Sequence, residues 1–297
     1  MTVITLLDGG LGQELVHRAG TQPTPLWSTQ VMLDRPDLVL AAHQDFFASG
    51  ARIAVANTYA LHPDRLKGTE YESRYDELFD TALALAEAAR DKRGSGRIAG
   101  SIGPLVASYR PDLHPTDAIA IPLYQQVAAR FVERCDLIIC ETVASVDHAR
   151  SALSGAAVSG LPVWLAFTVD DEDGSRLRSG EPLQEAVSIA MAGADAVLVN
   201  CSAPEAIPAS LPILQSSSLP FGAYANAFEQ ITNDFLKDKP TVDALTKRRD
   251  MSPEAYATHV LSWVDQGATI VGGCCEVGPD HIAEIARRLE AAGHTII

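Results

Sequence analysis

Basic residues are scarce in this chain of 297 residues. Lysine and arginine total 23 against 38 aspartates and glutamates, so the formal net charge is −15 at pH 7. A protein that neutralises nucleic-acid phosphates needs clustered basic side chains, and the longest basic run here is only 247–249. The sequence therefore predicts no nucleic-acid partner.

Long apolar runs and cysteines are also scarce. No stretch approaches the roughly 18 apolar residues of a membrane helix, so we expect no membrane span. The first eight residues lack the basic start and small-residue cleavage site of a signal peptide. The five cysteines are an odd number in a large chain. We therefore expect a cytoplasmic protein with reduced thiols, in which cysteine serves metal binding or catalysis rather than disulfides.

What the chain does contain is a regular alternation of two patterns. Short β-branched apolar runs suit strands buried on both faces, as in parallel sheets. The runs predicted as strands are 3–7, 50–57, 97–101, 135–141, 162–168, 193–200, 219–225 and 267–273. The stretches with helical spacing are 36–49, 72–92, 117–133, 145–158, 182–192, 203–213, 253–265 and 279–291.

This alternation requires parallel strands joined by right-handed crossovers. Eight strand–helix units in 297 residues fit a closed (β/α)₈ TIM barrel, an α/β fold. The glycines at 9, 10 and 12 lack the spacing of a dinucleotide-binding fingerprint. No Pro-, Gly- or Ser-rich linker divides the chain, so we predict one domain over 1–297.

Polar residues gather where the predicted strands end. In a barrel the active site lies at the C-terminal ends of the strands. The residues at those ends are Asp8, Asn57, Thr58, Ser101, Glu141, Asn200, Cys201, Asn226, Cys274 and Cys275. Cys201 is far in sequence from the adjacent pair Cys274 and Cys275, yet all three are expected at the same end of the barrel. Ligands of a catalytic metal site are often brought together in this way.

The chemistry of such a site follows from the ligand type. Thiolates are soft ligands that suit Zn²⁺, which usually takes four ligands in a tetrahedron. Three protein thiolates leave one position open and give a net negative centre, which is a poor Lewis acid. Such a centre can still hold an incoming thiol as its thiolate at neutral pH. The residues therefore favour activation of a substrate thiol for attack on an electrophile.

The cysteines have competing interpretations. Cysteine is among the most buried residue types, so Cys201 by itself also fits core packing. The glycines 272–273 allow a tight bend that aims both Cys274 and Cys275 inward. That pair also fits a redox couple or a disulfide between neighbours. From the residues alone, zinc and these alternatives stay open.

Several motifs together resemble a known family. They are Leu-Asp-Gly-Gly at 7–10, Gly-Ser-Ile-Gly-Pro at 100–104, Glu-Thr at 141–142, Asn-Cys-Ser at 200–202 and Gly-Gly-Cys-Cys at 272–275. In this order they resemble the zinc-dependent homocysteine S-methyltransferases, which include the S-methylmethionine and betaine enzymes and the homocysteine module of methionine synthase. The resemblance runs from about residue 5 to 290. It implies that Cys201, Cys274 and Cys275 bind one Zn²⁺ per chain.

The same resemblance implies roles for five further residues. Asp8 and Gly9 match positions that help to hold homocysteine, and Glu141 matches the acidic residue that receives its ammonium group. Thr58 and Asn226 match polar pocket positions. The competing interpretations are a helix N-cap for Asp8, before a helix over 11–19, and a surface pairing with arginine for Glu141.

Other segments concern the binding of the methyl donor. Trp27 and Tyr59 either face a cationic methyl donor or pack the first loop. The chain departs from the family pattern at 276–279 and 224–227, beside the pocket. The acidic run 170–173 is expected to be a solvated loop without an ion, and 229–252 a lid or a surface loop.

The resemblance thus implies an enzyme that transfers a methyl group from a cationic donor to the thiol of L-homocysteine and forms methionine. S-Methylmethionine or S-adenosylmethionine ranks first as the donor, and betaine or a dimethylsulfonio compound ranks second. Two other classes stay open. One is a metal-free barrel lyase or aldolase that uses Glu141 and Asp8 as acid and base, and the other is a barrel that binds homocysteine without turnover.

Overall fold

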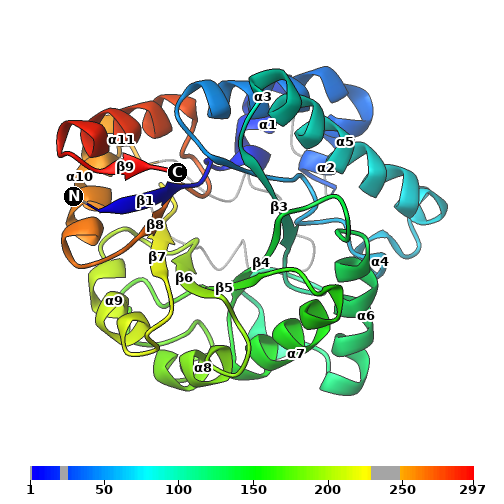
Figure 1. The fold of residues 1–297 in the computed structure, drawn as a ribbon. Helices are drawn as coiled ribbons and strands as arrows, with labels where there is room; N and C mark the ends of the chain where they lie inside the picture. The colour runs from blue at the N-terminus through cyan, green and yellow to red at the C-terminus, as the bar shows by residue number, and fades with distance from the viewer. Residues whose placement is uncertain (1, 21–25, 229–247) are drawn as a thin grey trace.

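The strands form one parallel sheet. The computed structural model describes residues 2–20, 26–228 and 248–297. The strands run around a central axis (Figure 1). They are β1 (Val3–Leu6), β2 (Ile53–Val55), β3 (Arg97–Ile102), β4 (Leu137–Val143), β5 (Val163–Phe167), β6 (Ala196–Asn200), β7 (Phe221–Tyr224), β8 (Ile270–Val271) and β9 (Thr295–Ile296).

The sheet closes on itself, which confirms the predicted α/β barrel. Its order is β2-β3-β4-β5-β6-β7-β8-β1-β9, and all printed strand pairs are parallel. A parallel bridge between Leu7 and Ile53 joins the β1 and β2 sides. The Arg52 N–H also donates to the Leu6 carbonyl at 2.8 Å. No sheet edge is left open between β1 and β2, as barrel closure requires.

The helices surround the strands as an outer ring (Figure 1). They are α1 (Leu11–Ala19), α2 (Ser28–Asp34), α3 (Pro36–Ala48), α4 (Pro63–Leu66), α5 (Tyr75–Arg93), α6 (Asp117–Ala129), α7 (Val146–Ala156), α8 (Leu183–Ala190), α9 (Ile207–Gln215), α10 (Pro253–Asp265) and α11 (Pro279–Ala291). None of the described helices is both long enough and apolar enough to cross a membrane.

Burial on both faces explains why the strands read as continuous apolar runs. In β4, Leu137 and Ile139 belong to a cluster inside the barrel. Their neighbours Ile138 and Cys140 belong to the larger core between strands and helices. Successive side chains of a strand point to opposite faces, so the part of a strand that is packed on both faces is apolar at successive residues.

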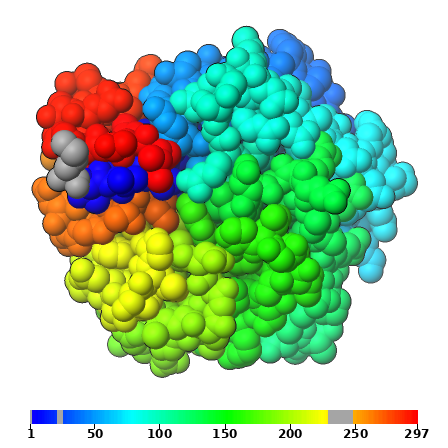
Figure 2. Space-filling model, in the orientation of Figure 1, coloured from blue at the N-terminus to red at the C-terminus, as the bar shows by residue number. Residues whose placement is uncertain are grey.

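The structure adds short elements that the sequence pattern does not reveal. Helices α2 and α4 lie in the loops after β1 and β2, and they have seven and four residues. The last strand, β9, pairs with Val3 and Ile4 of β1. The first and last segments of the chain accordingly lie side by side on the face shown in Figure 2. Elements this short carry too few residues for a periodic signal.

Candidate active site

A cavity of about 620 Å³ lies at the C-terminal ends of the barrel strands. Residues at or after the ends of β1, β2, β3, β4, β6, β7 and β8 line it. Its position is the one where barrel enzymes bind their substrates. The loop after β1, which carries Trp27, and the loops after β2 and β3 complete its wall.

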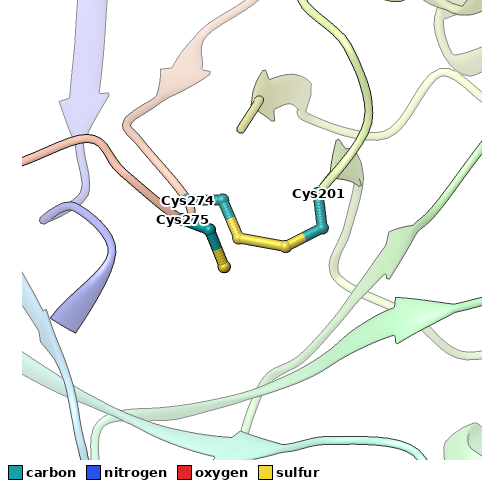
Figure 3. Close-up of side chains that lie close together, drawn as sticks. All are labelled: Cys201, Cys274 and Cys275. Atoms are coloured by element: carbon teal, nitrogen blue, oxygen red, sulfur yellow. A yellow bond between two sulfur atoms is a disulfide. The ribbon is translucent and has the colours of Figure 1, made fainter. Parts of the chain in front are cut away.

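Three cysteines converge on this cavity. Cys201 follows β6, while Cys274 and Cys275 follow β8, and their sulfur atoms all lie within 4.8 Å of one another. Cys201 and Cys274 are joined by a disulfide, and Cys275 is a free thiol beside it (Figure 3). Within the described residues, this is the group of metal-ligating side chains close enough to share an ion. A disulfide between the neighbours 274 and 275, one of the alternatives from the sequence, is not what forms.

The backbone around the cysteines is tightly constrained. Cys201 has a positive φ of 47°, which is uncommon for a side chain other than glycine and turns the chain sharply after β6. Gly10, before α1, packs directly on the backbone of the other two cysteines. A Cβ at Gly10 would lie 2.8 Å from the carbonyl carbon of Cys274 and 2.9 Å from the Cα of Cys275. The loop after β1 and the loop after β8 therefore hold each other in place.

This donor set fits a tetrahedral zinc ion. A Zn–S distance of about 2.3 Å places two sulfur ligands about 3.8 Å apart. The three sulfur atoms already lie within 4.8 Å, so small side-chain rotations bring them to that spacing once the disulfide is reduced. Three thiolates would leave one zinc position for a further ligand, and all three cysteines line the cavity.

Glu141, on β4, is a buried carboxylate in the cavity wall. The Ser101 hydroxyl donates to one of its oxygens, and the Tyr224 hydroxyl donates to the other at 3.0 Å. Burial raises the pKa of Glu141, and these two hydrogen bonds oppose the rise because they favour the ionised form. No described arginine pairs with this carboxylate, so the surface pairing considered from the sequence is wrong.

Asp8 is a second buried carboxylate, 2% exposed, directly after β1. One of its oxygens accepts the Val55 N–H at 2.8 Å, which ties the β1 and β2 ends together. Burial raises the pKa of Asp8 well above its usual value, and the nearby Glu141 adds to the rise. The N-cap residue of α1 is Gly10 rather than Asp8, so the capping alternative is wrong.

Aromatic rings form another part of the cavity wall. Trp27 and Tyr59 both line it, with ring centroids 6.2 Å apart in an edge-to-face arrangement. The indole N–H of Trp27 donates to Gln13 at 3.0 Å, and the Tyr59 hydroxyl bonds to Ser108 at 2.6 Å. Aromatic faces beside a negatively charged site attract a sulfonium or quaternary ammonium group.

Comparison with known proteins agrees with this site. A model of the family described as homocysteine S-methyltransferase matches residues 5–289. The chain belongs to the homocysteine S-methyltransferase family. It is 29% identical to the homocysteine S-methyltransferase of Escherichia coli (strain K12), over 96% of this chain and 95% of that one. It is 26% identical to the homocysteine S-methyltransferase YbgG of Bacillus subtilis (strain 168), over 95% and 93%.

A solved structure shows the same fold. The metallated form of the homocysteine methyltransferase MmuM from Escherichia coli superimposes with a TM-score of 0.81 at 24% identity, and the match covers 96% of each chain. The family, the methyltransferase class and the barrel fold predicted from the sequence are therefore confirmed. The family acts on small molecules, which agrees with a cavity of this size.

Two residues expected in the pocket of this family member lie outside the cavity lining. Thr58 is fully buried, and its hydroxyl donates to the Ser101 carbonyl at 2.8 Å. The side-chain oxygen of Asn226 accepts the Phe228 N–H at 3.3 Å. The residues that line the cavity at these strand ends are Tyr59 and Phe228 instead. Adjacent side chains point in different directions, so a polar residue at a rim can still face the protein interior.

The acidic run 170–173 is not simply a solvated loop. Asp171 forms an ion pair with Arg178 at 2.7 Å, and both side chains are mostly buried. The guanidinium carbon of Arg178 lies 5.5 Å from the ring centroid of Tyr109, which lines the cavity. The expectation is therefore wrong for Asp171, which supports the cavity wall. Most of the expected lid or loop at 229–252 lies outside the described residues, which resume at 248.

The sequence analysis identified Ser101 at the strand ends but gave no role to two other hydrogen-bonding neighbours of the site, Glu276 and Tyr224. Glu276, noted only as a departure from the family pattern, accepts hydrogen bonds from Gln13 at 2.8 Å and interacts with His17 at 3.1 Å. Gln13 in turn accepts the indole N–H of Trp27. Tyr224 falls in the other departing segment and donates to Glu141. Each of the two segments that depart from the family pattern therefore contributes a polar side chain that holds a cavity residue in position.

Proposed function

We propose that this family member transfers a methyl group from a cationic donor to the thiol of L-homocysteine, with one zinc ion bound by Cys201, Cys274 and Cys275. The observation that carries the proposal is the convergence of these sulfur atoms on a cavity that also holds Asp8 and Glu141. A thiol-binding position and anionic groups for an ammonium thus occur in one enclosed site.

Zinc bound there supplies a position at which the homocysteine sulfur is held as a thiolate at neutral pH. The cysteines must be reduced for this, because a disulfide sulfur is no thiolate ligand. We therefore propose that the reduced protein is the active one. We also propose that it works in the cytoplasm, where thiols remain reduced.

The ammonium group of homocysteine would bind the carboxylates of the cavity wall, and the substrate's own carboxylate would need N–H donors. Its ammonium group fits Glu141, which Ser101 and Tyr224 keep oriented, and Asp8 and the Gly9 N–H lie on the opposite loop after β1. The barrel strands fix these groups, so the sulfur is aligned before reaction. We propose that residues 1–297 act as one homocysteine-binding domain.

In the transfer step, the homocysteine sulfur forms a bond to the methyl carbon and the bond from that carbon to the donor heteroatom breaks. The electron pair stays on the donor, which leaves as a neutral thioether or amine, and the product is methionine. Trp27 and Tyr59 are placed to face the cation. S-Methylmethionine or S-adenosylmethionine is the proposed donor, and betaine or a dimethylsulfonio compound is the second candidate.

The test combines metal analysis with a donor panel. Reduced wild type should contain close to one zinc per chain and form methionine with a sulfonium donor. The Cys201→Ser and Cys274→Ser proteins should lose most of the zinc and the activity, whereas Cys135→Ser, whose thiol is buried elsewhere, should retain both.

Three results would contradict the proposal. Zinc content that is unchanged in both cysteine variants would show that the ligands are wrong. Zinc and homocysteine binding without methionine from any donor would indicate a binding protein, while activity without zinc would indicate the metal-free barrel enzyme.

A further inference from the structure

A chain of hydrogen bonds connects the aromatic wall of the cavity to a carboxylate outside the cavity lining. The indole N–H of Trp27 donates to the Oε1 of Gln13 at 3.0 Å. The Nε2 of Gln13 donates in turn to the Oε1 of Glu276 at 2.8 Å. Trp27 and Gln13 line the cavity, whereas Glu276 is not among the described residues that line it. Gln13 therefore links the aromatic wall to Glu276.

The chemistry of its two partners determines how the Gln13 amide is oriented. An indole N–H can only donate a hydrogen bond, and an ionised carboxylate can only accept one. The amide oxygen of Gln13 must therefore face Trp27, and the amide nitrogen must face Glu276. In the reversed orientation two donors would meet at Trp27 and two acceptors at Glu276. The carboxylate thus selects the amide orientation that can hold the indole.

The Gln13 side chain has open space on both sides. A second cavity, of about 720 Å³, lies between α1 and the start of α11, and Gln13 lines both this cavity and the catalytic one. Glu276 lines the second cavity. A glutamine side chain has several rotatable bonds and many rotamers. The bond to Glu276 therefore restricts a flexible side chain that stands in the wall between two cavities.

Glu276 is itself held firmly. Its side chain is 3% exposed, and both of its oxygens lie 3.1 Å from the Nε2 of His17. Its φ of 65° is uncommon for a residue other than glycine, and such a conformation persists where the surrounding structure imposes it. The Cys274 carbonyl accepts the Val277 N–H at 3.1 Å, which closes the turn that carries Glu276. The carboxylate is therefore already in place for Gln13.

Trp27 requires support of this kind. Its φ of 47° also lies in the region that side chains other than glycine rarely adopt, so its position depends on neighbouring groups. Loss of the bond to Gln13 would release the indole from the cavity wall. Asp8 and Glu141 would stay in place, because the strand ends and other hydrogen bonds hold them. The effect should therefore fall on the substrate that the aromatic wall contacts.

We propose that Glu276 and Gln13 are positioning residues for the methyl donor: Glu276 orients the Gln13 amide, which holds the Trp27 indole in the cavity wall. The inference rests on the proposed function, since it takes Trp27 as a contact of the donor, and it makes no choice among donors. Glu276 belongs to the segment 276–279 that departs from the family pattern, so the family resemblance does not imply this role.

The experiment follows the Trp27 indole by NMR and methyl transfer by kinetics. Reduced, zinc-loaded protein is labelled with ¹⁵N at the indole nitrogens of its three tryptophans, and Trp27→Phe identifies the Trp27 signal. The KM and kcat are measured with S-methylmethionine and homocysteine. The variants are Glu276→Ala, Glu276→Gln, Gln13→Met and the double variant Glu276→Ala with Gln13→Met. The control is Glu14→Ala, which removes a carboxylate that also lines the second cavity but pairs with Arg18.

Glu276→Ala should shift the Trp27 indole signal and raise the KM for the donor about fivefold, the usual effect of one hydrogen bond. Gln13→Met should do the same, because a thioether is only a weak acceptor. Glu276→Gln should restore most of both properties, since its amide oxygen can still accept from Gln13. The double variant should match Gln13→Met alone, because Glu276 acts through Gln13.

Other properties separate this role from a purely structural one. In each variant the kcat and the KM for homocysteine should stay within about twofold of wild type. The zinc content and the other two indole signals should not change. The control Glu14→Ala should leave the Trp27 signal and the KM for the donor at wild-type values. If Glu276→Ala did not fold, Gln13→Met and Glu276→Gln would still give the comparison.

An unshifted Trp27 signal in Glu276→Ala would overturn the proposal, and so would additive effects in the double variant. Loss of zinc or a higher KM for homocysteine in Glu276→Ala would show that Glu276 acts on the cysteine turn instead. Failure of the proposed function looks different, because wild type itself would then form no methionine. The indole signal would still decide whether Glu276 holds Trp27 through Gln13.

Discussion

At the scale of single residues, the site depends on carboxylates that are buried for function rather than for stability. Glu141 and Asp8 both have pKa values raised by burial, and hydrogen bonds only partly oppose this. A buried carboxylate without a cationic partner costs free energy in the folded state. The substrate ammonium group would supply the missing partner.

Tyr224→Phe tests whether the Tyr224 hydroxyl lowers the pKa of Glu141. The Tyr224 hydroxyl donates to the carboxylate and favours its ionised form, so its removal raises the pKa of Glu141 further. The acidic limb of kcat/KM for homocysteine should then move to higher pH, with a loss of about tenfold at neutral pH. Tyr71→Phe, on an outer loop, should leave the profile unchanged, and an unshifted limb in Tyr224→Phe would contradict the assignment.

Asp8→Asn should stabilise the zinc-free protein. The folded-state pKa of Asp8 lies above the unfolded value, so the folded protein binds more protons between the two, and stability is lost as pH rises through this range. An asparagine oxygen can still accept the Val55 N–H. The melting temperature at pH 7 should therefore rise by a few degrees, and the gain should vanish at about pH 3, below the ordinary pKa of aspartate. A lower melting temperature at pH 7 would refute this account.

At the scale of elements, the cavity depends on how α1 packs against the loop that follows it. Gly12, in α1, lies against the indole of Trp27, and Gln13 holds the indole N–H. A Cβ at Gly12 would lie 2.9 Å from the Cε2 of Trp27 and closer still to other ring atoms. The helix therefore sets the position of an aromatic ring in the cavity wall.

Gly12→Ala should displace Trp27 without unfolding the barrel, because alanine favours the helix and the backbone of Gly12 needs no positive φ. We expect the KM for the methyl donor to rise about tenfold, in line with the loss of a cation–π contact of about 1–2 kcal/mol. Zinc content should not change. Gly20→Ala would test only backbone strain, because a Cβ there meets nothing, and it should leave the donor KM unaltered. An unchanged donor KM in Gly12→Ala would exclude Trp27 from donor binding.

At the scale of the whole molecule, the oxidation state decides whether the site can bind metal. The structure joins Cys201 to Cys274 and leaves Cys135, Cys140 and Cys275 free. The disulfide closes across strand ends that the barrel brings together from positions 73 residues apart. Two electrons must enter before all three proposed ligands become available.

Thiol counting under denaturing conditions should therefore give three thiols per chain for the oxidised protein and five after reduction. Only the reduced protein should take up zinc, and zinc should then protect Cys201, Cys274 and Cys275 from alkylation. Mass spectrometry of the alkylated peptides measures both effects. Full zinc uptake by protein with three free thiols would contradict the ligand assignment.

Local sequence patterns predict the order of the eight barrel strands and of the main helices, but not α2, α4 or β9. Alternating apolar runs and helical spacing were sufficient because both periods are local, and the ranges 253–265 and 279–291 match α10 and α11 from end to end. The cysteine motifs and Glu141 were likewise recognisable, because strand ends converge in any barrel.

Which residues at the strand ends face the cavity, and which partners hold them, depends on contacts that form only in the folded chain. Thr58 bonds to the Ser101 backbone, whereas Tyr224, within the predicted strand 219–225, donates to Glu141. Side-chain direction beyond a strand end depends on loop geometry and on partners distant in the chain. The sequence therefore predicts which residues lie at the strand ends, but not which of their side chains point into the cavity.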